Sequence, residues 1–352
     1  MGSHFEESMK ENYKSERYIG HRPLGRVAWA GAVLLITVSC QAQNLFVSET
    51  SSNSIVEITP GGAKSVFATG LNGPVGLAFN STGDLFAANY AVNGVITEIT
   101  PSGAKSNPFG YINDAPGGPP YGLAFDSSGD LFISELSAAG VVEIKPYIMN
   151  RTVVQGLNDP EGMACDSAGD LFVADSYSDR IYKFTPGGVL TNIVSVHGPF
   201  GLAFNSAGDL YVSSIYGSII KITPGGVQTT FASGLSEFCW LAIDNADHLF
   251  VADKGTGNIY EFTASGTRNT FASGLKDPAG LAFQPVPQLQ SVSTGGTFQV
   301  SVKMPPPYYS TIVQASTNLV NWINIYTNTP PFIFSGSRTT TSARFYRAVL
   351  DP

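Results

Sequence analysis

The sequence predicts an all-β protein whose main part is a six-bladed β-propeller. Three observations lead to this prediction. A unit of about 41 residues recurs six times. Every unit divides into short runs that have the character of β-strands. The two ends of the array are also incomplete units, and together they make one whole unit.

The recurring unit begins with a core close to Pro-x-Gly-Leu-Ala-Phe. Its copies align at Gly76, Gly122, Gly162, Gly201, Trp240 and Gly280. After the core come a turn of the form N/D-S-x-G-D and a second run such as LFVAD (171–175). A third run such as RIYKF (180–184) and a fourth such as TTFASGL (229–235) follow. The runs are β-branched or aromatic and alternate with period two, and Gly, Pro, Asn or Asp bounds them. Four antiparallel strands joined by hairpins make one propeller blade.

The third core position is alanine in all six copies, which places a methyl group where the other core residues are large. We expect this side chain to face the crowded central axis, with the flanking Leu and Phe pointing into the seam between blades. The six alanines are Ala78, Ala124, Ala164, Ala203, Ala242 and Ala282.

The ends of the array predict how the ring closes. The first copy starts at a second strand, LFVSE (45–49), whereas the last copy, GLAFQPV (280–286), stops after a first strand. We therefore expect the last strand to pair beside the first three. Closure of this kind also removes the exposed sheet edges of an open array. The propeller is expected to span 43–286.

The N-terminal segment 1–42 is typical of a secretory signal. Five basic residues precede an uncharged apolar run at 27–40, and the small residues of CQA (40–42) follow. We expect cleavage after Ala42 and a secreted or cell-envelope protein. The alternative is a retained membrane anchor, although the apolar run is shorter than the span of about 20 residues that a bilayer requires.

The repeat ends before the C-terminal tail. Residues 287–297 are expected to be a linker. Residues 298–352 contain five strand-like runs, which predict a small β-sandwich: FQVSV (298–302), TIVQAST (311–317), WINIYT (322–327), FIFSG (332–336) and ARFYRAVL (343–350). The pattern ASTNLVNW (315–322) with RFYRAV (344–349) resembles modules appended to secreted proteins of environmental bacteria. It is open whether this module attaches the protein to something or only stabilises it.

The repeat itself resembles the NHL repeat and, more distantly, the senescence-marker and gluconolactonase-like propellers. The resemblance rests on units such as DPEGMACDSAGDLFVADSYSDRIYKFTPGG (159–188) and covers about 43–286. It implies the propeller fold. For function it implies a wide range, because the superfamily includes lactonases, lyases, sensor domains and protein-binding modules.

Two rings of residues are expected to meet at one end of the propeller channel. The second strands end in Glu49, Asn89, Glu135, Asp175, Ser214 and Asp253. The residues just before the core Gly-Leu are Val75, Tyr121, Glu161, Phe200, Cys239 and Ala279. The acidic members, Glu161 with Glu49, Glu135, Asp175 and Asp253, could hold Ca²⁺ or another divalent cation. Alternatively, a carboxylate that ends a strand accepts N–H bonds from the neighbouring loop.

Aromatic residues give this end a second possible use. Tyr121, Phe200 and Trp240, together with Asn89, could bind a flat group, an apolar group or a sugar. The alternative is that the rings only pack over the channel. The lactonase relatives place metal-binding Asn or Asp before the Gly-Leu of certain first strands, and only Glu161 could serve here. His197 is the candidate general base, whereas His248 occupies a turn at the opposite face.

Composition narrows the range of partners. The chain has a net charge of −8 and no basic cluster, so nucleic acid is not an expected partner. A membrane is expected to be involved only through an uncleaved N-terminal segment. We expect an exported scaffold that binds a polysaccharide, a peptide or a protein at the propeller mouth. The alternative is a divalent-metal-dependent lactonase, a related hydrolase or a lyase.

Overall fold

The computed structural model describes 43–285, apart from 91–93, 110–117, 137–138 and 146–150, and six strands between 288 and 350. The predicted signal segment 1–42 lies outside the described residues. Within the described residues, the one helical element is a single 3-10 turn, η1 (Thr50–Ser52). No helix in this part of the chain has the length and apolar character needed to cross a membrane.

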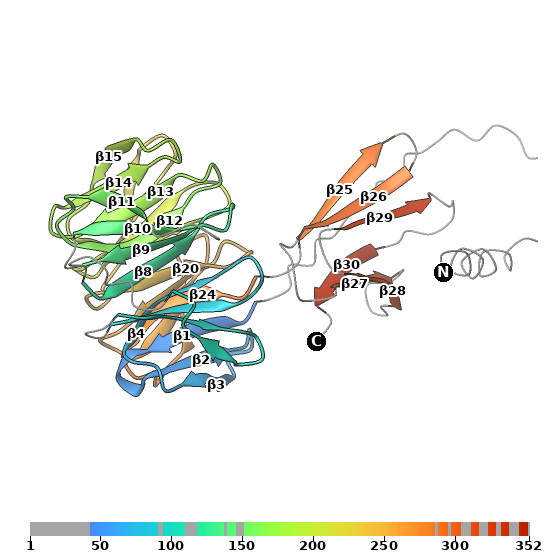
Figure 1. Ribbon diagram of the computed structural model, residues 1–352, viewed down its shortest axis with the longest axis horizontal. Coiled ribbons are helices and arrows are strands. Elements are labelled where there is room, and N and C mark those ends of the chain that lie inside the picture. Colours follow the sequence, from blue (N-terminus) through green and yellow to red (C-terminus); the bar gives the residue numbers. More distant parts are fainter. Residues whose placement is uncertain are drawn as a thin grey trace, which may run out of the picture. The chain divides into compact units, whose positions relative to one another are not determined.

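Six antiparallel sheets of four strands form the propeller (Figure 1). Within each blade, the strands run from the innermost to the outermost in the order given. Blade 1 contains β24 (Pro278–Phe283), β1 (Leu45–Glu49), β2 (Ser54–Ile58) and β3 (Lys64–Thr69). Blade 2 contains β4 (Pro74–Phe79), β5 (Leu85–Asn89), β6 (Ile96–Ile99) and β7 (Lys105–Ser106). Blade 3 contains β8 (Pro120–Phe125), β9 (Leu131–Glu135), β10 (Gly140–Ile144) and β11 (Arg151–Gln155).

The second half of the ring repeats this plan. Blade 4 contains β12 (Pro160–Cys165), β13 (Leu171–Asp175), β14 (Arg180–Phe184) and β15 (Leu190–Ser195). Blade 5 contains β16 (Pro199–Phe204), β17 (Leu210–Ser214), β18 (Ser218–Ile222) and β19 (Gln228–Ser233). Blade 6 contains β20 (Trp240–Ile243), β21 (Leu249–Asp253), β22 (Asn258–Phe262) and β23 (Arg268–Ala272).

Blade 1 closes the ring as the sequence predicts. Strand β24, from the C-terminal end of the array, pairs antiparallel with β1, and Leu45 lies opposite Phe283 in the register. The contact continues past the strand, where the backbone N–H of Gln284 donates to the carbonyl of Asn44 at 3.1 Å. The two ends of the repeat array therefore meet inside blade 1, and this pairing closes the ring.

The turn that follows each inner strand is set by local chemistry. In blade 3 the carboxylate of Asp126 accepts the N–H groups of Ser128 and Asp130, both at 2.9 Å, and Gly129 takes a φ of 87°. Glycine adopts this conformation without steric cost. Blade 6 makes the same turn with Asp247 at a φ of 61°, which aspartate tolerates better than most residues.

The apolar core lies in the seams between blades, and it corrects the expected role of the core alanine. Leu123 packs with Phe86 in the cluster between blades 2 and 3, whereas Ala124 packs with Phe132 and Leu171 between blades 3 and 4. Both faces of an inner strand are therefore seams, and the alanine does not face the axis. The side chains alternate between two neighbouring blades because the blades stack face to face.

The closest approach between inner strands occurs at the core glycine. A Cβ atom on Gly201 would lie 2.8 Å from the carbonyl oxygen of Cys239 in the next blade. Real Cβ atoms do not come this close, so the glycine is required for the inner strands to approach one another. The equivalent glycines of blades 1 to 4 are more crowded still, with nearest distances of 2.1–2.4 Å.

Buried serines join the inner strands at alternate seams. The Ser134 hydroxyl accepts the N–H of Gly122 and donates to the carbonyl of Glu161, both at 2.8 Å. Ser48 and Ser213 donate to the corresponding carbonyls of the next blades. Blades 2, 4 and 6 carry alanine at this position: Ala88, Ala174 and Ala252. The six-bladed ring thus alternates between two kinds of seam.

The C-terminal tail is all-β, as predicted. One antiparallel sheet contains β25 (Gln288–Thr294), β26 (Thr297–Lys303) and β29 (Phe332–Ser337). The other contains β27 (Thr311–Ser316), β28 (Ile323–Asn328) and β30 (Phe345–Leu350). The structure adds a strand to the five predicted ones, because β25 occupies most of the segment 287–297 that was expected to be a linker.

Candidate functional site

The start of each inner strand and the end of the second strand lie at the same face of the ring, as predicted. The register pairs Pro120 with Glu135 and Pro199 with Ser214. We call this face, formed by those strand ends and the loops beside them, the mouth. The two predicted rings of residues therefore share it, and the hairpin turns with the N/D-S-x-G-D sequence lie at the opposite face.

Three carboxylates that end second strands hold the mouth loops in place. Asp175 accepts the backbone N–H groups of Asn158 at 3.1 Å and Asp159 at 2.9 Å. Asp253 accepts the N–H of Ser236 at 3.1 Å, and Glu49 accepts the N–H of Lys276 at 2.8 Å. In each case the N–H group belongs to the loop that leads into the inner strand of the same blade.

The two uncharged residues that end second strands, Asn89 and Ser214, also bind neighbouring loops. The Asn89 side chain accepts the N–H of Asn72 at 3.0 Å and donates to the carbonyl of Val95 at 2.8 Å. The Ser214 hydroxyl donates to the carbonyl of His197 at 2.7 Å. Asn89, a predicted ligand-binding residue, is thus buried, and its side chain binds the loop before β4 and the loop before β6.

The three predicted aromatic residues come together across the channel. The ring centroids of Tyr121 and Trp240 are 5.5 Å apart, those of Tyr121 and Phe200 are 6.1 Å apart, and those of Phe200 and Trp240 are 5.3 Å apart. Phe200 is 0% exposed and Trp240 is also buried, whereas Tyr121 is half-buried. We call these three rings the aromatic plug. Trp240 replaces the core glycine of the other blades.

Sequence reasoning missed the aromatic side chains that surround the plug. Tyr90 meets Tyr121 edge to face at 5.6 Å, and Phe238 meets Phe200 at 5.4 Å. Their exposed fractions are 48% and 42%, and Tyr177 and Tyr216 on further mouth loops are 83% and 63% exposed. The signal in the sequence was an aromatic residue within two positions of a strand end at the mouth.

Glu161 differs from the carboxylates that end second strands. It is only 6% exposed, and its Oε2 atom is buried without a hydrogen-bond partner. Burial, together with the negative charge of Asp159, raises the pKa of Glu161 to about 9. Burial also raises the pKa of Tyr121, and Glu161 adds to that effect. Glu161 is therefore a neutral acid at neutral pH.

Glu135 is the second mouth carboxyl with a perturbed pKa. Burial raises the pKa of Glu135 to about 7. The five candidate metal ligands do not assemble into one site: among the described residues, no group of three His, Cys, Asp or Glu side chains is arranged to hold a metal ion. Glu49, Asp175 and Asp253 instead direct their oxygens at loop N–H groups.

His197, the candidate general base, lies exposed on the rim of the mouth. Its Nδ1 atom is 2.9 Å from the Asp179 carboxylate, and its ring stacks on Tyr216 with a centroid distance of 4.3 Å. The N–H of Gly198 and the His197 ring both lower the pKa of Asp179. His248 lies in a turn of the opposite face, within 3.2 Å of Asp244.

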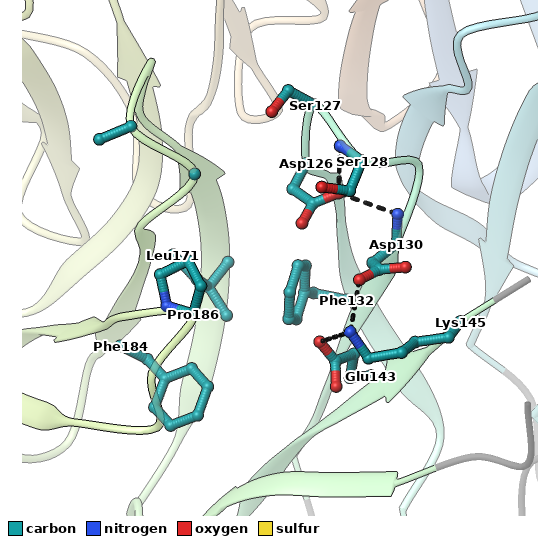
Figure 2. Close-up of a pocket in the computed structure, with 12 residues that line it drawn as sticks. Asp126, Ser127, Ser128, Asp130, Phe132, Glu143, Lys145, Leu171, Phe184 and Pro186 are labelled. Carbon is teal, nitrogen blue, oxygen red and sulfur yellow. Dashed lines mark hydrogen bonds and ion pairs between the residues drawn. The ribbon is translucent and has the colours of Figure 1, made fainter.

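A cavity of about 180 Å³ opens at the opposite face, between blades 3 and 4. Figure 2 shows Lys145 reaching the carboxylates of Asp130 and Glu143, across from the apolar side chains of Leu171 and Phe184. The Lys145 Nζ atom lies 2.7 Å from Asp130 and 3.1 Å from Glu143. Lys145 thus neutralises part of the acidic wall of this cavity.

Comparison with known proteins supports the fold. The chain is similar to a chain of the solved nidogen/laminin complex, with a TM-score of 0.62 and 17% identity over 69% of this chain and 98% of that one. A streptogramin B lyase gives a TM-score of 0.56 with 17% identity, over 74% and 87% of the two chains. Virginiamycin B lyase from Staphylococcus aureus gives 0.55 with 20% identity, over 76% and 90%.

These likenesses show a shared propeller fold and no more, because the identities are low. No protein-family model matches the sequence, and no curated protein matches it.

Proposed function

We propose that the chain is an exported propeller of the NHL type that binds a polysaccharide, peptide or protein at its mouth. One observation carries this proposal. In the described part of the chain, the strongly exposed aromatic side chains all lie in mouth loops: Tyr90, Tyr177, Tyr216 and Phe238. Aromatic rings exposed together on one face are typical of a binding surface, since they offer a large contact area at a small cost in conformational entropy.

The mouth loops are also held firmly enough to present these rings. Tyr90 follows Asn89, and Tyr216 follows Ser214 by two residues, so each ring is close to a strand end that is hydrogen-bonded to a neighbouring loop. A surface with fixed side chains loses less entropy on binding than a mobile one.

A binding survey with matched variants tests the proposal. The full chain is applied to a panel of immobilised polysaccharides and to a peptide library, and the same is done for Tyr90→Ala and Tyr216→Ala. The control is Val227→Ala, which removes an equally exposed apolar side chain from the loop before β19. We expect the mouth variants to lose at least about tenfold in affinity, as truncated aromatic anchors do, and the control to bind normally. Unchanged binding by the mouth variants would refute the proposal.

Glu161 favours one other function, that of a metal-dependent lactone or ester hydrolase or a lyase. A buried acid with a raised pKa in a mouth is a feature of many catalytic sites. Elemental analysis of the purified full chain, followed by a lactone panel, decides this alternative. One tightly held divalent cation per chain that is lost in Glu161→Ala would support it, and a chain that carries no metal and shows no thermal shift with Ca²⁺ would exclude it.

Export is a separate part of the proposal. It rests on the basic and apolar pattern of 1–42. Mass spectrometry of the protein recovered outside the cytoplasm should find a chain that begins after Ala42. An intact N-terminus on membrane-bound protein would instead support the retained anchor.

A further inference from the structure

One oxygen of the Glu161 carboxyl lacks the partners that Asp175, Asp253 and Glu49 have. Asp175, at the end of a strand in the same blade, accepts three short N–H contacts. Glu161 is buried, and its Oε2 atom has no hydrogen-bond partner. Buried polar groups are nearly always paired, because an unpaired one costs free energy. A partner from outside the chain would account for this exception.

The propeller repeat fixes where this carboxyl lies. Val75, Phe200 and Ala279 occupy the same strand position in other blades, and they pack together with Tyr121 in one cluster. Glu161 holds that position in blade 4, between Tyr121 of blade 3 and Phe200 of blade 5. Its carboxyl group therefore belongs to the same ring of side chains as Tyr121 and Phe200 of the aromatic plug.

The charges of the mouth favour a cation as the partner. The two rings of mouth residues contain five carboxyl groups and no basic residue: Glu49, Glu135, Glu161, Asp175 and Asp253. Tyr121, the half-buried ring of the aromatic plug, adds an aromatic surface, and such surfaces attract cations. The mouth loops also carry Lys254 and Lys276, so the acidic excess lies in the two rings themselves, and such an excess attracts ligands of the opposite sign.

The shape of the site favours an organic cation over a metal ion. A Ca²⁺ ion needs six to eight oxygen ligands, whereas the described mouth residues offer no group of three acidic or metal-binding side chains for one ion. An alkylammonium group needs one carboxylate and aromatic surface. Glu161 supplies the carboxylate, and Tyr121 with its edge-to-face neighbour Tyr90 supplies the surface.

We propose that the mouth binds an organic ammonium group, with its positive charge against the Glu161 carboxylate and its methyl or methylene groups against Tyr121 and Tyr90. This inference rests on the proposed function, since it names the chemical class of the ligand at the same mouth. The aromatic contact and the unpartnered Oε2 atom of Glu161 together distinguish this ligand from a neutral sugar.

Binding of this kind releases a proton. Glu161 carries a proton at neutral pH, because its pKa is raised to about 9, and it must lose that proton to pair with an ammonium group. Asp159 is the charged group that acts on Glu161, and Glu161, Tyr90 and Asp159 in turn act on Tyr121. Tyr121 stays neutral over this range since its own pKa is raised, so the released proton comes from Glu161.

Isothermal titration of the full chain with two probes tests the inference. The probes are choline and 3,3-dimethyl-1-butanol, which has the same shape without the charge. We expect choline to bind at least about tenfold more tightly, equivalent to about 1.4 kcal/mol. Titration at neutral pH in two buffers of different ionisation heat should show close to one proton released per choline bound.

Two variants and a control complete the experiment. Glu161→Gln should abolish both the preference for choline and the proton release, and Tyr121→Leu should weaken choline binding while leaving the alcohol unchanged. Glu98→Gln, whose carboxylate bonds to Ser106 away from the mouth, should behave as the wild type. Circular dichroism and a thermal melt confirm that each variant is folded.

The inference fails if the two probes bind equally, if neither binds, or if Glu161→Gln keeps the preference for choline. None of these outcomes bears on the proposed function, which the polysaccharide and peptide panel with Tyr90→Ala and Tyr216→Ala decides. If Tyr216→Ala loses binding to the panel and still binds choline, the partner surface lies on the rim and the ammonium site is intact.

Discussion

Replacing Ser134 by alanine removes a hydroxyl group that joins the inner strands of blades 3 and 4. In the wild type this hydroxyl accepts the N–H of Gly122 and donates to the carbonyl of Glu161, both at 2.8 Å. Ser134 is 0% exposed. Blades 2, 4 and 6 carry alanine at the same position, so the variant should still fold into the same ring, and its stability can be compared directly.

The structure sets the expected loss. The substitution leaves one backbone donor and one backbone acceptor buried in the seam, and each unsatisfied group costs about 1–3 kcal/mol. We therefore expect Ser134→Ala to lower the free energy of unfolding by about 2–6 kcal/mol.

Urea denaturation followed by tryptophan fluorescence measures this loss, because Trp240 lies buried in the plug. The matched control is Ser127→Ala in an exposed turn of the same blade, which should change stability by less than about 0.5 kcal/mol. If Ser134→Ala is no more destabilising than Ser127→Ala, the buried serine does not join the blades in the way described.

Three further predictions concern the seams and the mouth. Gly201→Ala should destabilise the fold by about 1–3 kcal/mol in urea titrations, because the added methyl group meets a neighbouring inner strand, and a neutral result would contradict the close approach. Leu281→Ala in the closing strand should cost about 2–5 kcal/mol, as much as Leu202→Ala inside the ring, if the closure is a full blade. Wild-type stability should fall as the pH rises from 4.5 toward about 9, by up to about 1.4 kcal/mol per pH unit, since the folded chain keeps a proton on Glu161 that the unfolded chain has lost. Glu161→Gln should flatten this slope in urea titrations across that range, and equal slopes would show that Glu161 is not a buried neutral acid.

Much of the fold was open to prediction because its signals are local. The four runs of each unit alternate with period two, and turns such as 126–130 carry glycine where φ must be positive. Incomplete units at the two ends predicted that β24 would pair with β1, and the register confirms it. Among the strands, only those of the tail differed from the prediction. Strand β25 was expected to be a linker, because its Gln, Ser and Thr residues resemble a linker in composition.

The sites depended on contacts that local patterns do not contain. The sequence showed that Glu49, Asp175, Asp253 and Glu161 would lie at one face, because strand ends at a common edge of the ring follow from the repeat. It did not show which of them would find partners. That depends on whether a neighbouring loop turns its N–H groups toward the carboxylate.

The sequence by itself determined the ring, its six blades and the face where the two rings of residues meet, because period-two strands and glycine turns act over a few residues. The tertiary structure decided which groups are satisfied there. Asp175 meets N–H groups about one hairpin away, and Ser134 bonds to the carbonyl of Glu161 in the next blade. The Oε2 atom of Glu161 meets none, since burial by neighbouring blades removes water from it without supplying a partner.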